Sequence, residues 1–271
     1  MSDVQIAFIG AGKMVTSIVK SLVRSCSFEP QQMICCSAKD GTSEKLSSET
    51  GINRSESACE MMNSKPTILV LGCKPQQFIE LPSSISPKTK NCIILSIMAG
   101  INFKGLAKVF SQSKNLVRSM PNTPGQIGQG ITGYIFLKTP TKSDHAFIIK
   151  VLSSLGKVCE VKEEADIDRV TALSGSGPAY VFEFACALEE AGKEIGLSPI
   201  LSSQLAQQTL IGAAKLIESS DLHPRELRKQ VTSPNGTTQA ALESFSEDQL
   251  GEIVLRAVKA AQKRSIQLSD A

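Results

Sequence analysis

The sequence predicts an α/β domain with a doubly wound, mostly parallel sheet, followed by an all-helical domain. Two observations carry this prediction. Residues 4 to about 161 alternate short β-branched runs with helical stretches, and after about residue 162 only helical spacing remains. A chain of 271 residues is long enough for two such domains. We therefore expect one domain over residues 1–162 and a second over residues 163–271.

Seven short runs in the first part of the chain have the composition of strands. They cover residues 4–9, 32–36, 67–71, 92–97, 115–118, 131–137 and 157–161. Runs such as ILVLG and CIILSI are almost continuously apolar, which is typical of parallel strands covered on both faces. Because helical stretches separate the runs, right-handed crossovers are expected to produce a doubly wound sheet.

The second part of the chain has apolar residues at helical spacing, for example Leu201, Leu205 and Leu210. Two segments interrupt it, SGSGP at residues 174–178 and SPNG at residues 233–236. The later helices have broad apolar faces, which favours packing against a second subunit. The alternative is a helical domain that is closed on itself.

Composition and charge exclude several classes of function. The chain is 41% hydrophobic and 20% charged with a net charge of +3, and its basic residues are scattered, so we expect no nucleic-acid partner. No apolar run is long enough to span a membrane, and because the N-terminal sequence MSDVQIAFIG enters a strand pattern almost at once, we expect no cleaved leader. Several of the eight cysteines lie in or beside expected strands, namely Cys35, Cys36, Cys73, Cys92 and Cys159. Their spacing fits no metal site, so we expect buried thiols, no metal and a cytoplasmic protein.

The segment IGAGKM, residues 9–14, lies between the first expected strand and the first helix. In this position Gly10 can make the tight turn, and Gly12 removes a Cβ that would block a pyrophosphate at the helix N-terminus. We therefore expect a Rossmann-like, dinucleotide-binding first domain. Val15 stands where a third glycine or an alanine would let helix and strand pack closely. The alternative is an ordinary strand–turn–helix connection.

The residues after the second expected strand distinguish between nicotinamide cofactors. NAD enzymes usually have Asp or Glu there, whereas this chain has Cys-Cys-Ser37-Ala-Lys39, with no acid before Asp40. A hydroxyl and an ammonium group suit a 2′-phosphate, so we expect NADPH, with NADH as a weaker alternative. Lys39 can also be read as a solvated loop charge.

Three further segments have the composition of ligand-binding loops. LGCKP at residues 71–75 and RSMPNTP at residues 118–124 follow expected strands, and Asn122 lies in a rigid, polar loop between prolines. Structural turns are the alternative for both. In VTSPNGTTQAAL, residues 231–242, a proline and Asn-Gly predict a turn, and Thr237-Thr238 supply N-cap hydroxyls to the following helix. This loop is expected to bind an anion.

Five motifs, IGAGKM, the KP of LGCKP, RSMPNTP, LSGSGPAYVF and VTSPNGTTQAAL, resemble in order and spacing those of the pyrroline-5-carboxylate reductases. The resemblance covers nearly the whole chain. It implies an NADPH-dependent oxidoreductase that reduces 1-pyrroline-5-carboxylate to L-proline, the last step of proline biosynthesis, by hydride transfer to the imine carbon. It also implies a helical dimerisation domain that interlocks two subunits, commonly within a larger ring.

The resemblance assigns individual residues. It implies cofactor contacts from Ile9, Gly10, Ala11, Gly12, Lys13, Met14, Ser37, Cys73, Lys74, Pro75, Met98 and Ala99, to which the sequence itself adds Lys39 and Asn122. It implies substrate contacts from Glu164, Ser233, Gly236, Thr237 and Thr238. The chain departs from the family pattern at Val15, at Ala58 and at Gly72-Cys73, where the family has alanine, asparagine and Ala-Val.

Thr238 is the expected catalytic residue, as the hydrogen-bond donor to the ring nitrogen that becomes an amine. A protonated imine already carries its proton, so a strong general acid is not required, and the two histidines, His145 and His223, are expected to be structural. A β-hydroxyacid dehydrogenase is the runner-up, but such enzymes have a lysine after the second glycine-rich turn, and here none occurs before Lys193. A catalytically idle NADPH-sensing scaffold is the alternative from another class.

Overall fold

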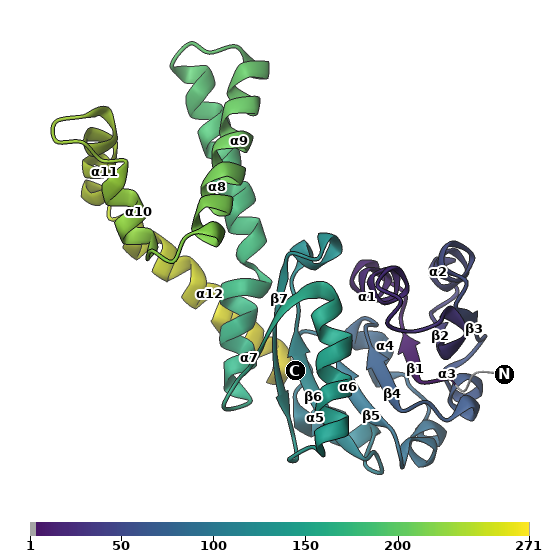
Figure 1. Ribbon diagram of the computed structural model, residues 1–271. Helices are drawn as coiled ribbons and strands as arrows, with labels where there is room; N and C mark the ends of the chain where they lie inside the picture. Colours follow the sequence, from purple (N-terminus) through teal and green to yellow (C-terminus); the bar gives the residue numbers. More distant parts are fainter. Residues whose placement is uncertain (1–3, 271) are drawn as a thin grey trace. The chain divides into compact units, whose positions relative to one another are not determined.

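A computed structural model describes residues 4–270 and shows an eight-stranded sheet followed by long helices (Figure 1). The strands are β1 Ile6–Ile9, β2 Met33–Cys36, β3 Asn53–Arg54, β4 Ile68–Leu71, β5 Ile93–Ser96, β6 Asn115–Met120, β7 Gly130–Phe136 and β8 Gly156–Glu160. The first helices are α1 Lys13–Arg24, α2 Thr42–Thr50, α3 Ala58–Met61, α4 Pro75–Ile79, α5 Phe103–Val109 and α6 Lys142–Leu152. The later helices are α7 Ala165–Val170, α8 Gly177–Glu194, α9 Pro199–Ser219, α10 Pro224–Gln230, α11 Thr237–Glu247 and α12 Leu250–Asp270.

The order of the strands is β3-β2-β1-β4-β5-β6-β7-β8, and all neighbours are parallel except β6 and β7. The predicted doubly wound, mostly parallel sheet is confirmed, and each of the seven expected strands is present. The strand that the sequence did not predict is β3, because two exposed polar residues carry no apolar signal.

Alternate residues of the central strands pack into two separate cores, one on each face of the sheet. On one face, α1 contributes Val15, Ile18, Val19 and Leu22, the i, i+3, i+4, i+7 pattern of a helix with one buried side. On the other face, α4 and α5 pack against Ala7, Ile9 and their neighbours. Because both faces are covered, the continuous apolar runs of the sequence are explained.

The contacts divide the chain at Ser176. The part before it forms one compact unit together with the end of α12 from Ala261, and Gly177–Ala260 forms the second. The end of α12 belongs to the first unit because Ser265 donates a 2.6 Å hydrogen bond to the buried Asp168 of α7, and Asn102 donates to the carbonyl of Ser269. The predicted division of the chain into a cofactor domain, residues 1–162, and a dimerisation and substrate domain, residues 163–271, stays a prediction.

The second unit is helical, as predicted, and no residue of it that the structure describes is in a strand. Helices α8 and α9 pack closely where a Cβ on Gly192 would lie 2.8 Å from the Ser202 hydroxyl oxygen. Many large apolar side chains of these helices are exposed in the single chain, including Phe182 at 64%. An exposed apolar surface of this kind is typical of an interaction site.

All eight cysteines are free thiols. Cys35, Cys36, Cys73 and Cys92 are buried as expected, but the expectation is wrong for Cys159, which is exposed. Its strand, β8, is at the edge of the sheet, where side chains are less covered. Among residues 4–270, no helix combines the length and the apolar character needed to cross a membrane.

Candidate active site

The turn after β1 requires glycine at its first position. Gly10 has a φ of +95°, and a Cβ there would lie 2.7 Å from backbone atoms of Gly72 and Cys73. The N–H of Gly10 donates a 2.8 Å hydrogen bond to the carbonyl of Cys36 at the end of β2. The turn therefore brings the ends of three strands, β1, β2 and β4, into contact.

The second glycine leaves the start of α1 open. Gly12 is the N-cap residue, no described side chain caps the helix, and its first turn holds no acidic residue. A Cβ on Gly12 would meet no atom of the protein within 4 Å, so packing does not require glycine there. Free N–H groups at the positive end of a helix bind anions such as a pyrophosphate. Both glycines thus fit the roles predicted for them.

A cleft of about 440 Å³ lies at the carboxyl ends of β1, β2 and β4, where ligands bind in doubly wound sheets. Among the residues predicted to contact a cofactor, residues 9–12, Ser37, Cys73 and Lys74 line this cleft. Ala58, one of the expected departures from the family pattern, lines it as well. Lys39 does not, so its contact with a cofactor stays a prediction.

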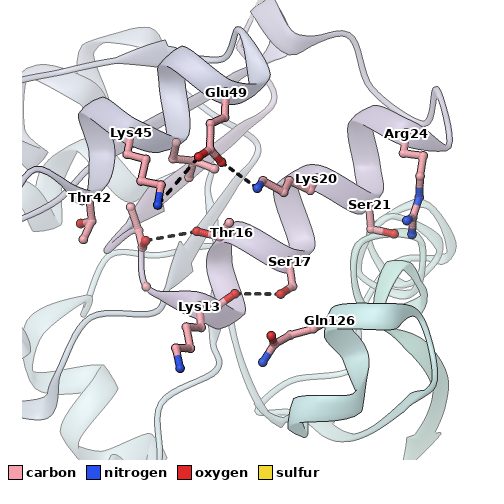
Figure 2. Close-up of a pocket in the computed structure, with 13 residues that line it drawn as sticks. Lys13, Thr16, Ser17, Lys20, Ser21, Arg24, Thr42, Lys45, Glu49 and Gln126 are labelled. Atoms are coloured by element: carbon pink, nitrogen blue, oxygen red, sulfur yellow. Dashed lines mark hydrogen bonds and ion pairs between the residues drawn. The ribbon is translucent and has the colours of Figure 1, made fainter.

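A second, larger cavity of about 620 Å³ runs along α1 and α2 and adjoins the cleft at Ala11 and Gly12 (Figure 2). Glu49 lies between two cations there, 2.7 Å from the ammonium of Lys20 and 3.9 Å from that of Lys45. Lys13 lines this cavity rather than the cofactor cleft. Cofactor contacts from Lys13 and from the neighbouring Met14 therefore stay predictions.

Two departures from the family pattern compensate for each other. Val15 is fully buried on α1, and a Cβ on Gly72 would lie only 2.3 Å from its Cγ2 atom. The larger side chain at position 15 thus fills the space that the missing side chain at position 72 leaves. Close packing of α1 on the sheet is preserved, although the third position of the glycine motif is a valine.

The loop after β2 folds back on itself. The Ser37 hydroxyl donates to Asp40 Oδ1 at 3.2 Å, and Thr42 donates to the same oxygen from its hydroxyl at 2.6 Å and its N–H at 3.0 Å. These bonds, those from Thr42 above all, hold the pKa of Asp40 below its ordinary value. Asp40 also lines the cofactor cleft. Asp40 is visible in the sequence, but it lies four residues after the end of β2, so the sequence does not show that the loop brings it back to Ser37.

Two thiols that line the cleft, those of Cys36 and Cys73, are neutral. Cys73 Sγ lies 3.7 Å from Met98 Sδ, and burial raises the pKa of Cys73 to about 11 and that of Cys36 to about 12. Both thiols therefore remain protonated at neutral pH and do not repel an anionic ligand. Met98 is buried and Ala99 is exposed just after β5, and Pro75 begins α4. A cofactor contact from these three residues stays a prediction.

Asn122 lies in the loop after β6, and both ends of its side-chain amide bond to the protein. Its Nδ2 donates to the carbonyl of Ser174 at 3.2 Å, and its Oδ1 accepts from the N–H of Ile131 at 3.0 Å. Ser174 belongs to a π-helical segment, Thr171–Gly175, in which a Cβ on Gly175 would lie 2.8 Å from Met120 Cε. The amide thus fixes this loop, and its predicted contact with a cofactor remains untested.

Glu164 forms an ion pair with a buried arginine. Its Oε1 accepts a 2.8 Å bond from Arg118, whose side chain is 4% exposed, and a 2.6 Å bond from the N–H of Phe103 at the start of α5. The carboxylate therefore joins the end of β6 to the starts of α5 and α7. Its contact with a substrate remains a prediction. Arg118 belongs to the RSMPNTP motif, but no local pattern in the sequence predicts its pairing with Glu164.

The SPNG turn lies in the second unit and opens α11. The predicted turn is present. Its positive φ, which Asn-Gly sequences favour, occurs at Asn235, at 57°, whereas Gly236 has a φ of −88°. A Cβ on Gly236 would lie 2.4 Å from the Ser233 hydroxyl oxygen, so a larger residue there would require the Ser233 side chain to rotate. The N–H of Asn235 donates to the Gln239 side chain at 2.8 Å, which closes the turn.

The expectation that Thr237 and Thr238 supply the N-cap is wrong. The N-cap residue is Gly236, no described side chain caps α11, and the two threonines are its first two residues. The turn at Asn235 starts the helix earlier than expected. Thr237 is exposed and Thr238 is partly buried. The first turn of α11 therefore has free N–H groups with a hydroxyl beside them, which fits an anion better than a cap would.

Both histidines have protein partners, as the structural interpretation expects. His145 Nε2 lies 3.2 Å from the Tyr134 hydroxyl and 3.6 Å from Glu160. His223 caps α10 by accepting a 3.2 Å bond from the N–H of Arg225.

A glycine turn that opens an uncapped helix at the carboxyl edge of a doubly wound sheet defines the class of dinucleotide-binding proteins. Comparison with known proteins refines this class. The model of the pyrroline-5-carboxylate reductase dimerisation family matches residues 164–268, and that of the coenzyme F420-dependent NADP oxidoreductases matches residues 5–100.

Known proteins with similar sequences or structures match this chain over nearly its whole length. Pyrroline-5-carboxylate reductase of Pseudomonas aeruginosa is 37% identical, covering 100% of this chain and 98% of that relative, and the Arabidopsis thaliana enzyme is 33% identical, covering 98% and 95%. The structure of a pyrroline-5-carboxylate reductase from Coxiella burnetii superposes with a TM-score of 0.90 at 28% identity and covers 99% of each chain. That of the Plasmodium falciparum enzyme with NADP bound has a TM-score of 0.84 at 28% identity, again covering 99% of each. The chain belongs to the pyrroline-5-carboxylate reductase family.

Proposed function

We propose that this protein reduces 1-pyrroline-5-carboxylate to L-proline with NADPH. The observation that carries the proposal is the full-length relationship to pyrroline-5-carboxylate reductases, at 37% identity for the Pseudomonas aeruginosa enzyme. The chemistry needs a dinucleotide site and an anion site. The glycine-turn cleft of the first unit suits the former, and the uncapped start of α11 in the second unit suits the latter.

The cleft fits a dinucleotide. The free N–H groups at the start of α1 would hold the pyrophosphate, and the absent Cβ of Gly12 leaves room for its oxygens. The cleft then extends past Ser37 on one side and Cys73 on the other. NADPH, when bound, supplies the hydride that is added to the imine carbon.

The start of α11 suits the substrate, a cyclic imine with a carboxylate. Its first-turn N–H groups would bind the carboxylate at the positive end of the helix. The Thr238 hydroxyl would donate a hydrogen bond to the ring nitrogen, whose lone pair develops as the C=N bond becomes a single bond. A protonated imine already carries the proton that the amine nitrogen needs, and the hydride adds to carbon. Thr238 would therefore orient the ring and stabilise the nitrogen lone pair, and it need not supply a proton. Ser233 and Gly236 would shape the loop around the carboxylate.

Self-association follows from the dimerisation domain of the family, which covers residues 164–268. We propose a homodimer or a larger ring in which the exposed apolar side chains of the second unit are covered. Those side chains include Val181, Phe182, Leu205, Ile211 and Ile217. Light scattering at micromolar concentration should give at least twice the mass of the chain, and a monomeric mass would exclude this assembly. We further place the protein in the cytoplasm, which suits its eight free thiols.

The test of the activity is to follow the absorbance of the reduced nicotinamide in the presence of the purified protein. We expect NADPH to be oxidised only after 1-pyrroline-5-carboxylate is added, with one L-proline formed for each NADPH consumed. If NADPH binds but is not oxidised in the presence of the imine, the protein is a nucleotide-binding scaffold and the proposal fails.

A further inference from the structure

Asp40 occupies the part of the cofactor cleft where dinucleotide-binding folds recognise the adenosine ribose. This part is the end of the second strand of the sheet's first βαβ unit, where an acid accepts hydrogen bonds from the ribose hydroxyls of NAD. Asp40 follows β2 by four residues, yet the loop bends just before it, where the N–H of Asp40 donates a 2.7 Å hydrogen bond to the carbonyl of Ala38, and the Asp40 side chain returns to Ser37. Asp40, Ser37 and Thr42 all line the cleft.

The carboxylate is held in place by bonds to one of its oxygens. The Ser37 hydroxyl, the Thr42 hydroxyl and the Thr42 N–H all donate to Oδ1, at 3.2, 2.6 and 3.0 Å. The side chain is exposed, so a ligand in the cleft can reach it. The Ser37 hydroxyl, which the sequence assigns to a 2′-phosphate, already donates to this carboxylate.

No arginine among the described residues that line the cleft offsets this negative charge. Lys74 is the lysine of the lining, and it lies after β4 rather than after β2. Arg54, the nearest arginine in sequence, pairs instead with Glu44 and Glu56. A 2′-phosphate carries a charge of about −1.5 to −2 and would meet the carboxylate as a like charge.

We propose that Asp40 sets the cofactor selectivity of this protein: its carboxylate accepts a hydrogen bond from the ribose 2′-hydroxyl of NADH and opposes the 2′-phosphate of NADPH. The preference for NADPH is then smaller than Ser37 and Lys39 alone would produce. This inference rests on the proposed function only in taking a nicotinamide dinucleotide as the ligand of the cleft.

The test is Asp40→Asn in the full-length protein. Asparagine keeps Oδ1 as the acceptor for Thr42, so the loop is retained and the charge is removed. Dissociation constants for NADPH and NADH are measured by the fluorescence of the reduced nicotinamide, without substrate. The ratio Kd(NADH)/Kd(NADPH) should rise about tenfold, which is the size expected for one like charge in a solvated cleft.

Glu44→Gln is the matched control. It removes the same charge from the first turn of α2, but Glu44 lies outside the cleft and pairs with Arg54, so the ratio should stay at the wild-type value. Asp40→Glu, which keeps the charge, should leave the ratio near the wild-type value. An unchanged ratio in Asp40→Asn, or an equal rise in Glu44→Gln, overturns the proposal.

Failure of this proposal can be told apart from failure of the proposed function. A shift in the binding ratio supports the role of Asp40 even if the protein does not oxidise NADPH with the imine. Conversely, turnover of the imine by an Asp40→Asn protein with the wild-type ratio upholds the reductase and refutes the role of Asp40.

Discussion

We predict that replacing each glycine of the turn after β1 with alanine impairs a different property: Gly10→Ala lowers the stability of the protein, and Gly12→Ala lowers its affinity for NADPH. In Gly10→Ala, the new Cβ lies 2.7 Å from the backbone of Gly72 and Cys73, in a residue with a φ of +95°. Left-handed backbone costs a non-glycine residue roughly 1–2 kcal/mol, and an overlap with backbone adds about 1–3 kcal/mol. We therefore expect a loss of about 3 kcal/mol, or a melting temperature lower by roughly 6–12 °C.

In Gly12→Ala, the new Cβ meets no protein atom within 4 Å, and the residue has an ordinary φ of −69°. The free energy of unfolding should therefore change by less than about 0.5 kcal/mol. The same Cβ stands where the pyrophosphate approaches the start of α1, so the Kd for NADPH should rise at least about tenfold, equivalent to about 1.4 kcal/mol.

Thermal unfolding and NADPH fluorescence titration, applied to both variants, separate the two roles. The expected result is a large loss of stability in Gly10→Ala and a large loss of affinity with normal stability in Gly12→Ala. Wild-type affinity in Gly12→Ala would refute the reasoning, because the pyrophosphate could not then lie at this turn.

Three further predictions follow from the structure. Thr238→Ala should lower kcat/KM about tenfold or more with nearly constant NADPH affinity, whereas Thr237→Ala, which keeps its N–H, should be milder; equal small effects would limit the loop to a structural role. Glu164→Gln keeps an acceptor for the start of α5 but leaves the charge of the buried Arg118 unpaired. The free energy of unfolding, measured by thermal denaturation, should therefore fall by about 1–2 kcal/mol. Wild-type stability would contradict a stabilising ion pair. Val15→Ala and Gly72→Ala should each destabilise by about 1–3 kcal/mol, and the double variant should lose less than their sum. Additive losses would show that the two positions do not compensate.

The sequence predicted those parts of the fold in which a local pattern reports burial. The runs ILVLG and CIILSI are buried on both faces of a parallel sheet, and nothing but such a strand explains their continuous apolar character. It could not predict β3, whose two residues are exposed, or the antiparallel direction of β7, because alternation within a strand does not encode the direction of its neighbour. Roles for Gly10 and Gly12 could be predicted because the position of each glycine in IGAGKM indicates where a Cβ atom would be unfavourable.

For the candidate site, the sequence identified the segments but not the partners of individual side chains. Asp40 was assigned no role because its return to Ser37 depends on a bend at Ala38 that the sequence does not indicate. Glu164 and Asn122 were assigned to ligands, and those contacts stay predictions; the structure adds their bonds to Arg118 and to Ser174 and Ile131. Such contacts join residues that are far apart in the chain, so no local pattern reports them.

The central claim is that this chain transfers a hydride from NADPH to the imine carbon of 1-pyrroline-5-carboxylate. The most direct measurement uses NADPH deuterated at the transferable position and examines the product by mass spectrometry and NMR. We predict L-proline with one deuterium, located at C5 and formed in equal amount to the NADPH consumed. Oxidation of the deuterated cofactor with no deuterium at C5, or no L-proline at all, would contradict the account.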